Sequence, residues 1–317
     1  MLIHREPWKY SGRTPEFFTG QAGCYCCGTA AIGNYHVFFG NKAGAIALAT
    51  GYKWSSSAWS AITSAATASD SRAIGYMENG VAYHSYGVDA SASRDSQKYE
   101  STPDSWTALT AGPTPARVTP VAFMITDAFV CGGRDFSLVV LSDNDSYSPS
   151  NDSWTAKTDI SAPARYEAHA FQLNGYGFVC GGINAAFQRI TDNERYDSQG
   201  DSWSAKANIP VARSSAGFFN IGNDGFLLSG REGTIVADSD YYTESTDAWT
   251  GTTNVPSPSR AQMASAAVSV ISAGYITTGF DSGGIRTKDH DEYTSGTWTS
   301  QTDISGDARG YATGASC

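Results

Sequence analysis

The stretch from Tyr166 to Arg213 reads YEAHAFQLNGYGFVCGGINAAFQRITDNERYDSQGDSWSAKANIPVAR and is the clearest copy of a pattern that the whole chain repeats. Its short apolar runs, such as the one from Tyr176 to Cys180, are bounded by Gly, Asn, Asp, Ser or Pro, which is typical of strands joined by tight turns. No run has the helical period of about 3.6 residues. We therefore expect the stretch to form a four-stranded antiparallel sheet.

Four kinds of marker residue keep one register along the chain: a Trp, a Tyr, a Gly and the Arg that ends each unit. Six tryptophans recur at intervals of 46 to 49 residues: Trp59, Trp106, Trp154, Trp203, Trp249 and Trp298. A tyrosine precedes each of the first five by seven residues and the last by five: Tyr52, Tyr99, Tyr147, Tyr196, Tyr242 and Tyr293. A glycine closes the second apolar run of each unit: Gly40, Gly87, Gly132, Gly181, Gly230 and Gly279. A period near 50 with four strands in each unit predicts an all-β propeller, here with six blades.

The repeat resembles a known family. Gly-Gly after an apolar strand, a Tyr, a Trp seven residues later and an Arg before the next strand are similar to the kelch repeat, over roughly residues 21 to 317. The resemblance implies a kelch-like β-propeller with four antiparallel strands in each blade. The full Gly-Gly occurs only at Gly132-Gly133 and Gly181-Gly182, whereas the other units keep one glycine. Because the units have diverged, the pattern alone carries no kelch function over to this chain.

The repeat divides the chain into an arm and a propeller. We expect residues 1–20 to lie outside the repeat and residues 21–317 to form the propeller, with units at about 21–72, 73–117, 118–165, 166–213, 214–260 and 261–309 and a last strand at 310–317. The arm is too aromatic for a disordered tail. We expect it either to pack across the first blade or to bind a protein partner or neighbouring subunit through Trp8, Tyr10, Phe17 and Phe18.

The two ends of the propeller offer the same strand. The run from Tyr311 to Ser316, YATGAS, resembles the run from Tyr25 to Ala30, YCCGTA, at the start of the first unit. Propellers commonly close by letting one terminus complete the blade that the other begins, which protects an exposed sheet edge. The last strand is therefore expected either to close its own ring or to be donated to a neighbouring subunit.

The charge of the chain restricts its partners. With 21 Lys and Arg against 31 Asp and Glu, the formal net charge is −10, which argues against nucleic acid and anionic membrane surfaces as partners. No apolar run is long enough to span a membrane. The first residues, MLIHREPWKYSGR, contain no apolar core of a secretory signal peptide. We expect the protein in a virion or an extracellular assembly, with the cytoplasm as the alternative.

The six cysteines fall into two groups. Cys131 and Cys180 hold the same position in adjacent units, directly before Gly-Gly, which favours small buried side chains. If both termini lie in the first blade, Cys317 could bond to one of three cysteines near the start: Cys24, Cys26 or Cys27. Free thiols are the other possibility. No metal site and no cofactor are expected, since the five histidines are scattered.

A search for catalytic motifs finds no G-x-S-x-G elbow, no H-E-x-x-H and no Walker loop. The densest cluster of acid and histidine, Asp289-His290-Asp291, is expected to be a solvated strand edge. The most regular polar feature is the arginine that ends each unit: Arg72, Arg117, Arg165, Arg213, Arg260 and Arg309. These marker arginines either tie carbonyl groups of adjacent blades together or form a cationic rim that binds a carboxylate, a sulfate or an acidic peptide.

Two functions from different classes remain. The missing catalytic motifs, the aromatic arm and the duplicated terminal strand favour a structural or binding protein without catalytic activity. A phage tail or attachment protein, or an extracellular assembly component that contacts proteins or glycans, fits this hypothesis by analogy. The alternative follows from the resemblance, because some kelch-like propellers are similar to galactose oxidase or sialate mutarotase. It is a sugar-handling enzyme, such as a mutarotase that acts in the axial pocket.

Overall fold

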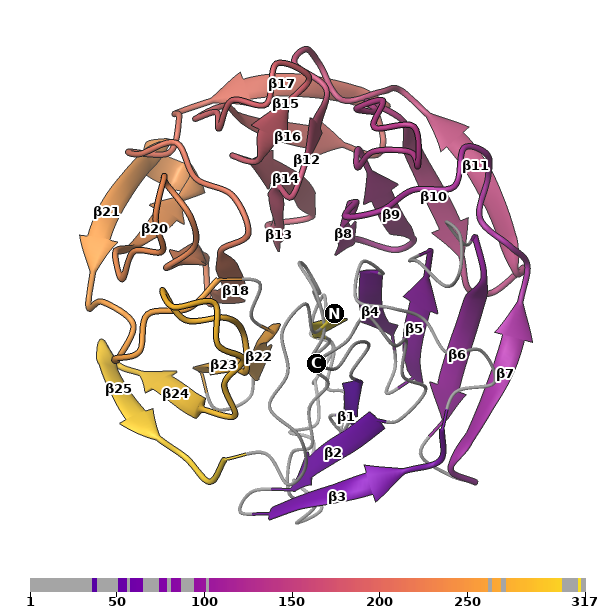
Figure 1. Ribbon diagram of the computed structural model, residues 1–317. Coiled ribbons are helices and arrows are strands. Elements are labelled where there is room, and N and C mark those ends of the chain that lie inside the picture. Colours follow the sequence, from indigo (N-terminus) through magenta and orange to yellow (C-terminus); the bar gives the residue numbers. More distant parts are fainter. Residues whose placement is uncertain are drawn as a thin grey trace, which may run out of the picture.

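The computed structural model describes residues 36–38, 51–55, 58–64, 74–78, 81–86, 94–100, 103–261, 264–268, 272–303 and 313–314. Within these residues the chain forms six four-stranded antiparallel sheets arranged in a ring (Figure 1). The single helical element among them is a short 3₁₀ turn, Glu244–Thr246. The prediction of an all-β propeller is confirmed.

The sheets, called blades 1 to 6 below, follow the chain in order. Blade 1 contains β1 (His36–Phe38), β2 (Gly51–Ser55), β3 (Ala58–Ile62) and β26 (Thr313–Gly314). Blade 2 contains β4 (Ile74–Glu78), β5 (Val81–Ser85), β6 (Ser96–Glu100) and β7 (Ser105–Leu109). Blade 3 contains β8 (Val121–Met124), β9 (Ala128–Cys131), β10 (Asn144–Ser148) and β11 (Ser153–Lys157).

The second half of the ring has the same construction. Blade 4 contains β13 (His169–Leu173), β14 (Tyr176–Cys180), β16 (Asn193–Asp197) and β17 (Ser202–Lys206). Blade 5 contains β18 (Gly217–Ile221), β19 (Asp224–Leu228), β20 (Ser239–Thr243) and β21 (Ala248–Thr252). Blade 6 contains β22 (Ala264–Val268), β23 (Ala273–Thr277), β24 (His290–Thr294) and β25 (Thr297–Ser300). A small additional sheet joins β12 (Arg165–Tyr166) to β15 (Ile183–Asn184).

The last strand of the chain pairs with the first. In β26, Thr313 and Gly314 lie opposite Phe38 and Val37 of β1, and the strand order of blade 1 is β26-β1-β2-β3. The C-terminal strand therefore takes the inner position that β4, β8, β13, β18 and β22 hold in the other blades. The predicted arm, residues 1–20, and the cysteines Cys24, Cys26, Cys27 and Cys317 lie outside the described residues.

A polar clamp links the outer strands of adjacent blades and explains the spacing of Tyr and Trp. In blade 4, the hydroxyl of Tyr196 donates to Asp201, whose carboxylate also accepts the backbone N–H of Thr158, just after the last strand of blade 3. Trp203 donates its indole N–H to the carbonyl oxygen of Thr158. The same clamp recurs around Asp104, Asp152 and Asp247.

Blade 6 departs from the clamp, which accounts for its shorter spacing. A turn at Ser295 and Gly296 replaces the longer turn that supplies the aspartate in blades 2 to 5. The hydroxyl of Tyr293 lies 2.6 Å from Oγ1 of Thr252 instead. The indole N–H of Trp298 keeps its bond to the carbonyl oxygen of Thr253. Among the described residues, no helix has the length and apolar character that crossing a membrane requires.

Candidate functional site

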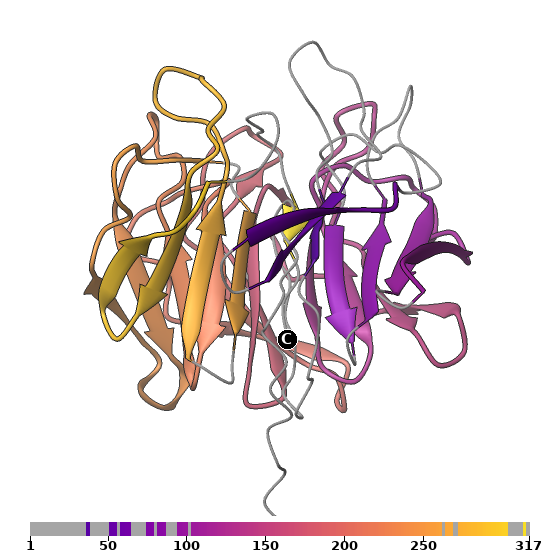
Figure 2. The ribbon, with the colours of Figure 1, turned by 90° about the horizontal axis from the view of Figure 1, so that it is seen from below.

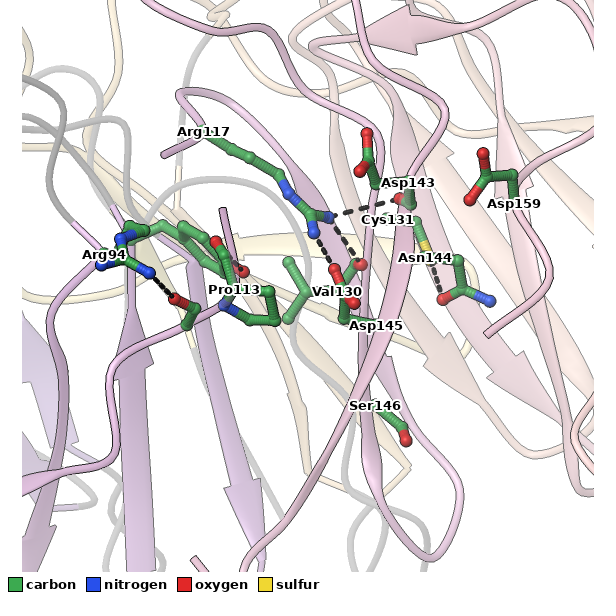
Figure 3. Close-up of polar contacts among 12 residues, drawn as sticks. Arg94, Pro113, Arg117, Val130, Cys131, Asp143, Asn144, Asp145, Ser146 and Asp159 are labelled. Atoms are coloured by element: carbon green, nitrogen blue, oxygen red, sulfur yellow. Dashed lines mark hydrogen bonds and ion pairs between the residues drawn. The ribbon is translucent and has the colours of Figure 1, made fainter. Parts of the chain in front are cut away.

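The four marker arginines that the structure describes are buried in ion pairs. Arg165 donates to Glu194 at 2.7 Å and Arg213 to Asp240 at 3.0 Å, while Arg117 pairs with Asp145 and Arg260 with Asp291. Each guanidinium also donates to backbone carbonyl oxygens; Figure 3 shows Arg117 reaching Val130 and Asp143. Arg72 and Arg309 lie outside the described residues.

These ion pairs and hydrogen bonds give the marker arginines a structural role. The four side chains are at most 1% exposed, so they present no cationic rim to a ligand. Their position also explains why the marker glycine recurs with them: Gly181 has φ of 60°, and a Cβ there would lie 2.8 Å from the carbonyl oxygen of Arg213. Sequence reasoning missed the acidic partners, although an acid recurs two residues before the marker tyrosine in four units: Asp145, Glu194, Asp240 and Asp291.

The histidines and cysteines of the described blades are also structural. The expectation of a solvated edge at Asp289-His290-Asp291 was wrong, because His290 and Asp291 are buried and Nδ1 of His290 lies 2.7 Å from Oγ1 of Thr277. Burial lowers the pKa of His169 and of His290 to about 3. Cys131 and Cys180 are buried free thiols, as predicted. No cluster of three or more His, Cys, Asp or Glu that could hold a metal occurs within the described residues.

A second set of arginines lies on the hairpins that join the second and third strands of blades 3 to 6. Each member is one half of a cross-strand pair in its hairpin: Arg134 with Val140, Arg189 with Ile183, Arg231 with Ile235 and Arg286 with Phe280. We call Arg134, Arg189, Arg231 and Arg286 the hairpin arginines. Unlike the marker arginines, they are partly exposed, and no acidic side chain among the described residues pairs with them.

The hairpins lie against the segments that enter the innermost strands. Arg134 pairs with Val118, and Arg231 with Ser214, through backbone hydrogen bonds. In each of these segments the second residue after the marker arginine has a left-handed backbone: Thr119 (φ 52°), Glu167 (φ 50°) and Ser215 (φ 57°). Left-handed φ is costly for side chains other than Gly, so three repeats of it in adjacent blades indicate a constrained rim.

Backbone hydrogen bonds join this rim from blade to blade. Glu167 donates its N–H to the carbonyl oxygen of Thr119, and Ser215 donates to that of Glu167. The hydroxyl of Ser215 also donates to the Glu167 carboxylate at 2.5 Å. The rim therefore holds a partly exposed carboxylate in a fixed position between blades 4 and 5.

Tyr166 lies beside that carboxylate and connects the rim to two hairpin arginines. The guanidinium carbon of Arg134 is 4.8 Å from the centroid of the Tyr166 ring. The pKa of the Tyr166 hydroxyl is raised, chiefly by burial and then by the negative charge of Glu167, against the opposing charges of Arg134 and Arg189. Arg189 in turn donates from Nε to Oγ of Ser214 at 3.3 Å. We call Arg134, Tyr166, Glu167, Arg189 and Ser215 the rim site.

The rim site joins groups with complementary chemistry. It contains a carboxylate that can accept a proton, a phenol that keeps its proton at neutral pH, and two cations for oxygen atoms that carry negative charge. None of its members was predicted from the sequence. The signal that could have indicated them is the polar or acidic residue two positions after the marker arginine, at Thr119, Glu167 and Ser215.

Comparison with known proteins supports the fold. No protein-family model matches the chain, and no curated protein matches it. Among solved structures, the chain is similar to one titled "Structure of YjhT", with a TM-score of 0.66 and 18% sequence identity over 76% of this chain and 86% of that chain. At that identity the similarity shows a shared β-propeller fold, and the kelch resemblance remains an interpretation of the repeat.

Proposed function

We propose that this protein is a sugar-handling β-propeller that binds a reducing sugar at the rim site and catalyses the exchange of its anomers. The observation that carries the proposal is the juxtaposition of Glu167, Tyr166 and Ser215 with two arginines at one end of the ring. The similarity to the YjhT structure supports a propeller framework for such a site. The expectation of a virion or extracellular assembly component has no support in the comparisons.

Exchange of anomers requires proton transfers together with reversible cleavage of the bond between the anomeric carbon and the ring oxygen. The ring opens when the anomeric hydroxyl loses a proton and the ring oxygen gains one, and it closes by the reverse transfers on either face of the carbonyl carbon. Glu167 is the group that would accept the hydroxyl proton, and Ser215 holds its carboxylate through a hydrogen bond. Tyr166, with its raised pKa, would donate to the ring oxygen. Arg134 and Arg189 would bind oxygen atoms of the sugar.

The test is a measurement of anomer exchange by magnetisation-transfer NMR on a panel of reducing sugars, neutral and acidic. The purified protein should accelerate exchange of at least one sugar. Glu167→Gln should lower that acceleration by roughly 100-fold or more, since a positioned acid or base contributes about that much. Glu100→Gln is the matched control, because Glu100 is a surface carboxylate whose partner is Lys98. Exchange at the uncatalysed rate for every sugar, or an unaffected Glu167→Gln variant, would contradict the proposal.

A further inference from the structure

Three hairpins of the ring expose large apolar side chains at their tips. The exposed fractions are 58% for Phe136, 53% for Leu138, 55% for Val139, 62% for Phe187 and 65% for Ile285. These are five of the six large apolar side chains that are exposed among the described residues; the sixth, Val211, lies in a connection between blades. The hairpins join the second and third strands of blades 3, 4 and 6 and lie at one end of the ring, where the loop between β23 and β24 rises in Figure 2.

The tips are ordered in a way that holds these side chains outward. Asp135, Asn184 and Asp281 each accept backbone N–H groups of their own turn. At the fourth position of the turn, blade 6 has Gly284 with φ of 75°, whereas blades 3 and 4 have Leu138 with φ of 67° and Phe187 with φ of 59°. Glycine adopts this conformation freely, and a large side chain adopts it at a cost. The hairpins of blades 3 and 4 therefore combine a strained backbone with exposed apolar side chains.

The charges near these tips indicate what covers them. Each of the three hairpins carries one hairpin arginine at its base, and among the described residues no acidic side chain pairs with it. The nearby carboxylates of Asp135 and Asp281 accept hydrogen bonds within their turns. An occupant that complements this surface has apolar groups for the tips and negative charges for the arginines. The net charge of −10 disfavours nucleic acid and anionic membranes, which present a far larger negative field.

We propose that the hairpin face, made of the tips at Phe136, Leu138, Val139, Phe187 and Ile285 with the arginines at their bases, docks an acidic, apolar segment of a partner protein. The apolar side chains of the segment pack on the tips, and its carboxylates pair with Arg134, Arg189 and Arg286. This surface shares Arg134 and Arg189 with the rim site, whereas its apolar tips lie outside that site and take no part in the proposed chemistry.

The substitution Leu138→Gly combined with Phe187→Gly gives a sharp test. Glycine is the residue that the left-handed position prefers, so the hairpins keep their conformation while the apolar side chains are lost. The probe is a fluorescently labelled random copolymer of Glu and Tyr, with poly-Glu and a copolymer of Lys and Tyr as controls. Binding is measured by anisotropy at low and high salt. Val211→Ser is the matched variant, because it removes an exposed apolar side chain outside the hairpins.

The wild-type protein and Val211→Ser should bind the Glu-Tyr copolymer in preference to both control polymers. The double glycine variant should bind it at least tenfold more weakly while unfolding at the same or a higher temperature. Absence of binding by the wild type, or equal binding by the double variant, would overturn the proposal. Equal binding of the Lys-Tyr copolymer would also overturn it. The same holds if the protein binds only zwitterionic vesicles, or if it self-associates in sedimentation and the double variant abolishes this, because these outcomes identify another occupant. Unchanged anomer exchange in the double variant keeps this test separate from that of the rim site.

Discussion

Gly225 on β19 lies directly against the ring of Phe171 on β13 of the preceding blade, where a Cβ would come within 2.6 Å of the ring. Phe171 has no room to move, because it is fully buried and stacks on Phe178 with ring centroids 5.1 Å apart. The same close approach occurs between Gly177 and Phe123 and between Gly274 and Phe219. Each pair fits an aromatic ring of one blade into the space left by a glycine on the next.

Gly225→Ala is therefore expected to destabilise the protein by about 1–3 kcal/mol, the usual cost of overpacking a filled core. Chemical denaturation followed by tryptophan fluorescence measures the difference. Gly233→Ala is the control, since a Cβ at position 233 meets no atom within 4 Å. That variant should stay within about 0.5 kcal/mol of the wild type. Equal stability of the two variants would show that the blades shift apart without cost.

Glu194→Gln is expected to destabilise the protein by about 3–5 kcal/mol, because it leaves the buried guanidinium of Arg165 without its counter-charge. Burial raises the pKa of Glu194 and lowers the pKa of Arg165, so for both groups burial outweighs the attraction of the partner. A double variant, Arg165→Met with Glu194→Leu, should therefore recover much of the loss. A double-mutant cycle in denaturant measures the coupling, and additive effects would contradict it.

The propeller could be predicted because its marker residues recur at regular intervals along the chain. Trp203 and Tyr196 recur in register with their counterparts, and the structure shows that both belong to one clamp between blades. Such a contact constrains residue type and spacing equally in every unit, so the pattern survives divergence. The acid partners of the marker arginines recur in four of the six units. Of these, Asp291 is expected at a solvated strand edge from the sequence, because strand alternation alone does not reveal that it faces the interior.

The rim site could not be predicted, because it is built from differences between units. The position of Glu167 is Thr119 in one neighbouring blade and Ser215 in the other, and no spacing rule distinguishes the carboxylate. Its proximity to Arg134 arises from contact between two blades. Such a contact is not visible when the sequence is compared one unit at a time. The strained backbone at Leu138 and Phe187 is likewise visible only in three dimensions.

The clamp aspartates predict a loss of stability in acid. The pKa of Asp201 is lowered, first by the hydrogen bond from Tyr196, and the pKa values of Asp152 and Asp247 are lowered as well. A carboxyl whose folded pKa lies below its unfolded value of about 3.9 stabilises the fold above that value. Its contribution is lost as the pH falls through the folded pKa.

Asp201→Asn keeps an oxygen that can accept the bonds of Tyr196 and Thr158 but removes the titrating charge. The variant should be less stable than the wild type at neutral pH, and the difference should shrink below pH of about 4. Urea denaturation across this range measures it. Asp159→Asn serves as control, because Asp159 accepts only an exposed bond from Ser142. A difference that stays constant with pH would show that the charge of Asp201 has no role in the clamp.

Burial of His290 predicts a second dependence of stability on pH. It arises from a ring that is neutral in the folded protein, whereas the first arises from charged carboxylates. Its folded pKa of about 3 lies well below the ordinary value of about 6.5, because burial disfavours the charged ring. Between these values the unfolded chain binds a proton that the folded chain does not, so stability falls as the pH falls from about 6.5, with a slope near 1.4 kcal/mol per pH unit for each such histidine. His169, with the same lowered pKa, adds an equal slope.

His290→Gln should therefore reduce the slope of unfolding free energy against pH between about 4 and 6, and the double variant with His169→Gln should reduce it further. The single variant itself should be less stable at neutral pH, because the ring contacts Tyr275 and Thr277. Denaturation at several pH values separates the two effects, since lost packing shifts every point equally whereas lost titration changes the slope. A wild-type protein whose stability is flat between pH of about 4 and 6.5 would contradict the burial of both rings as neutral groups.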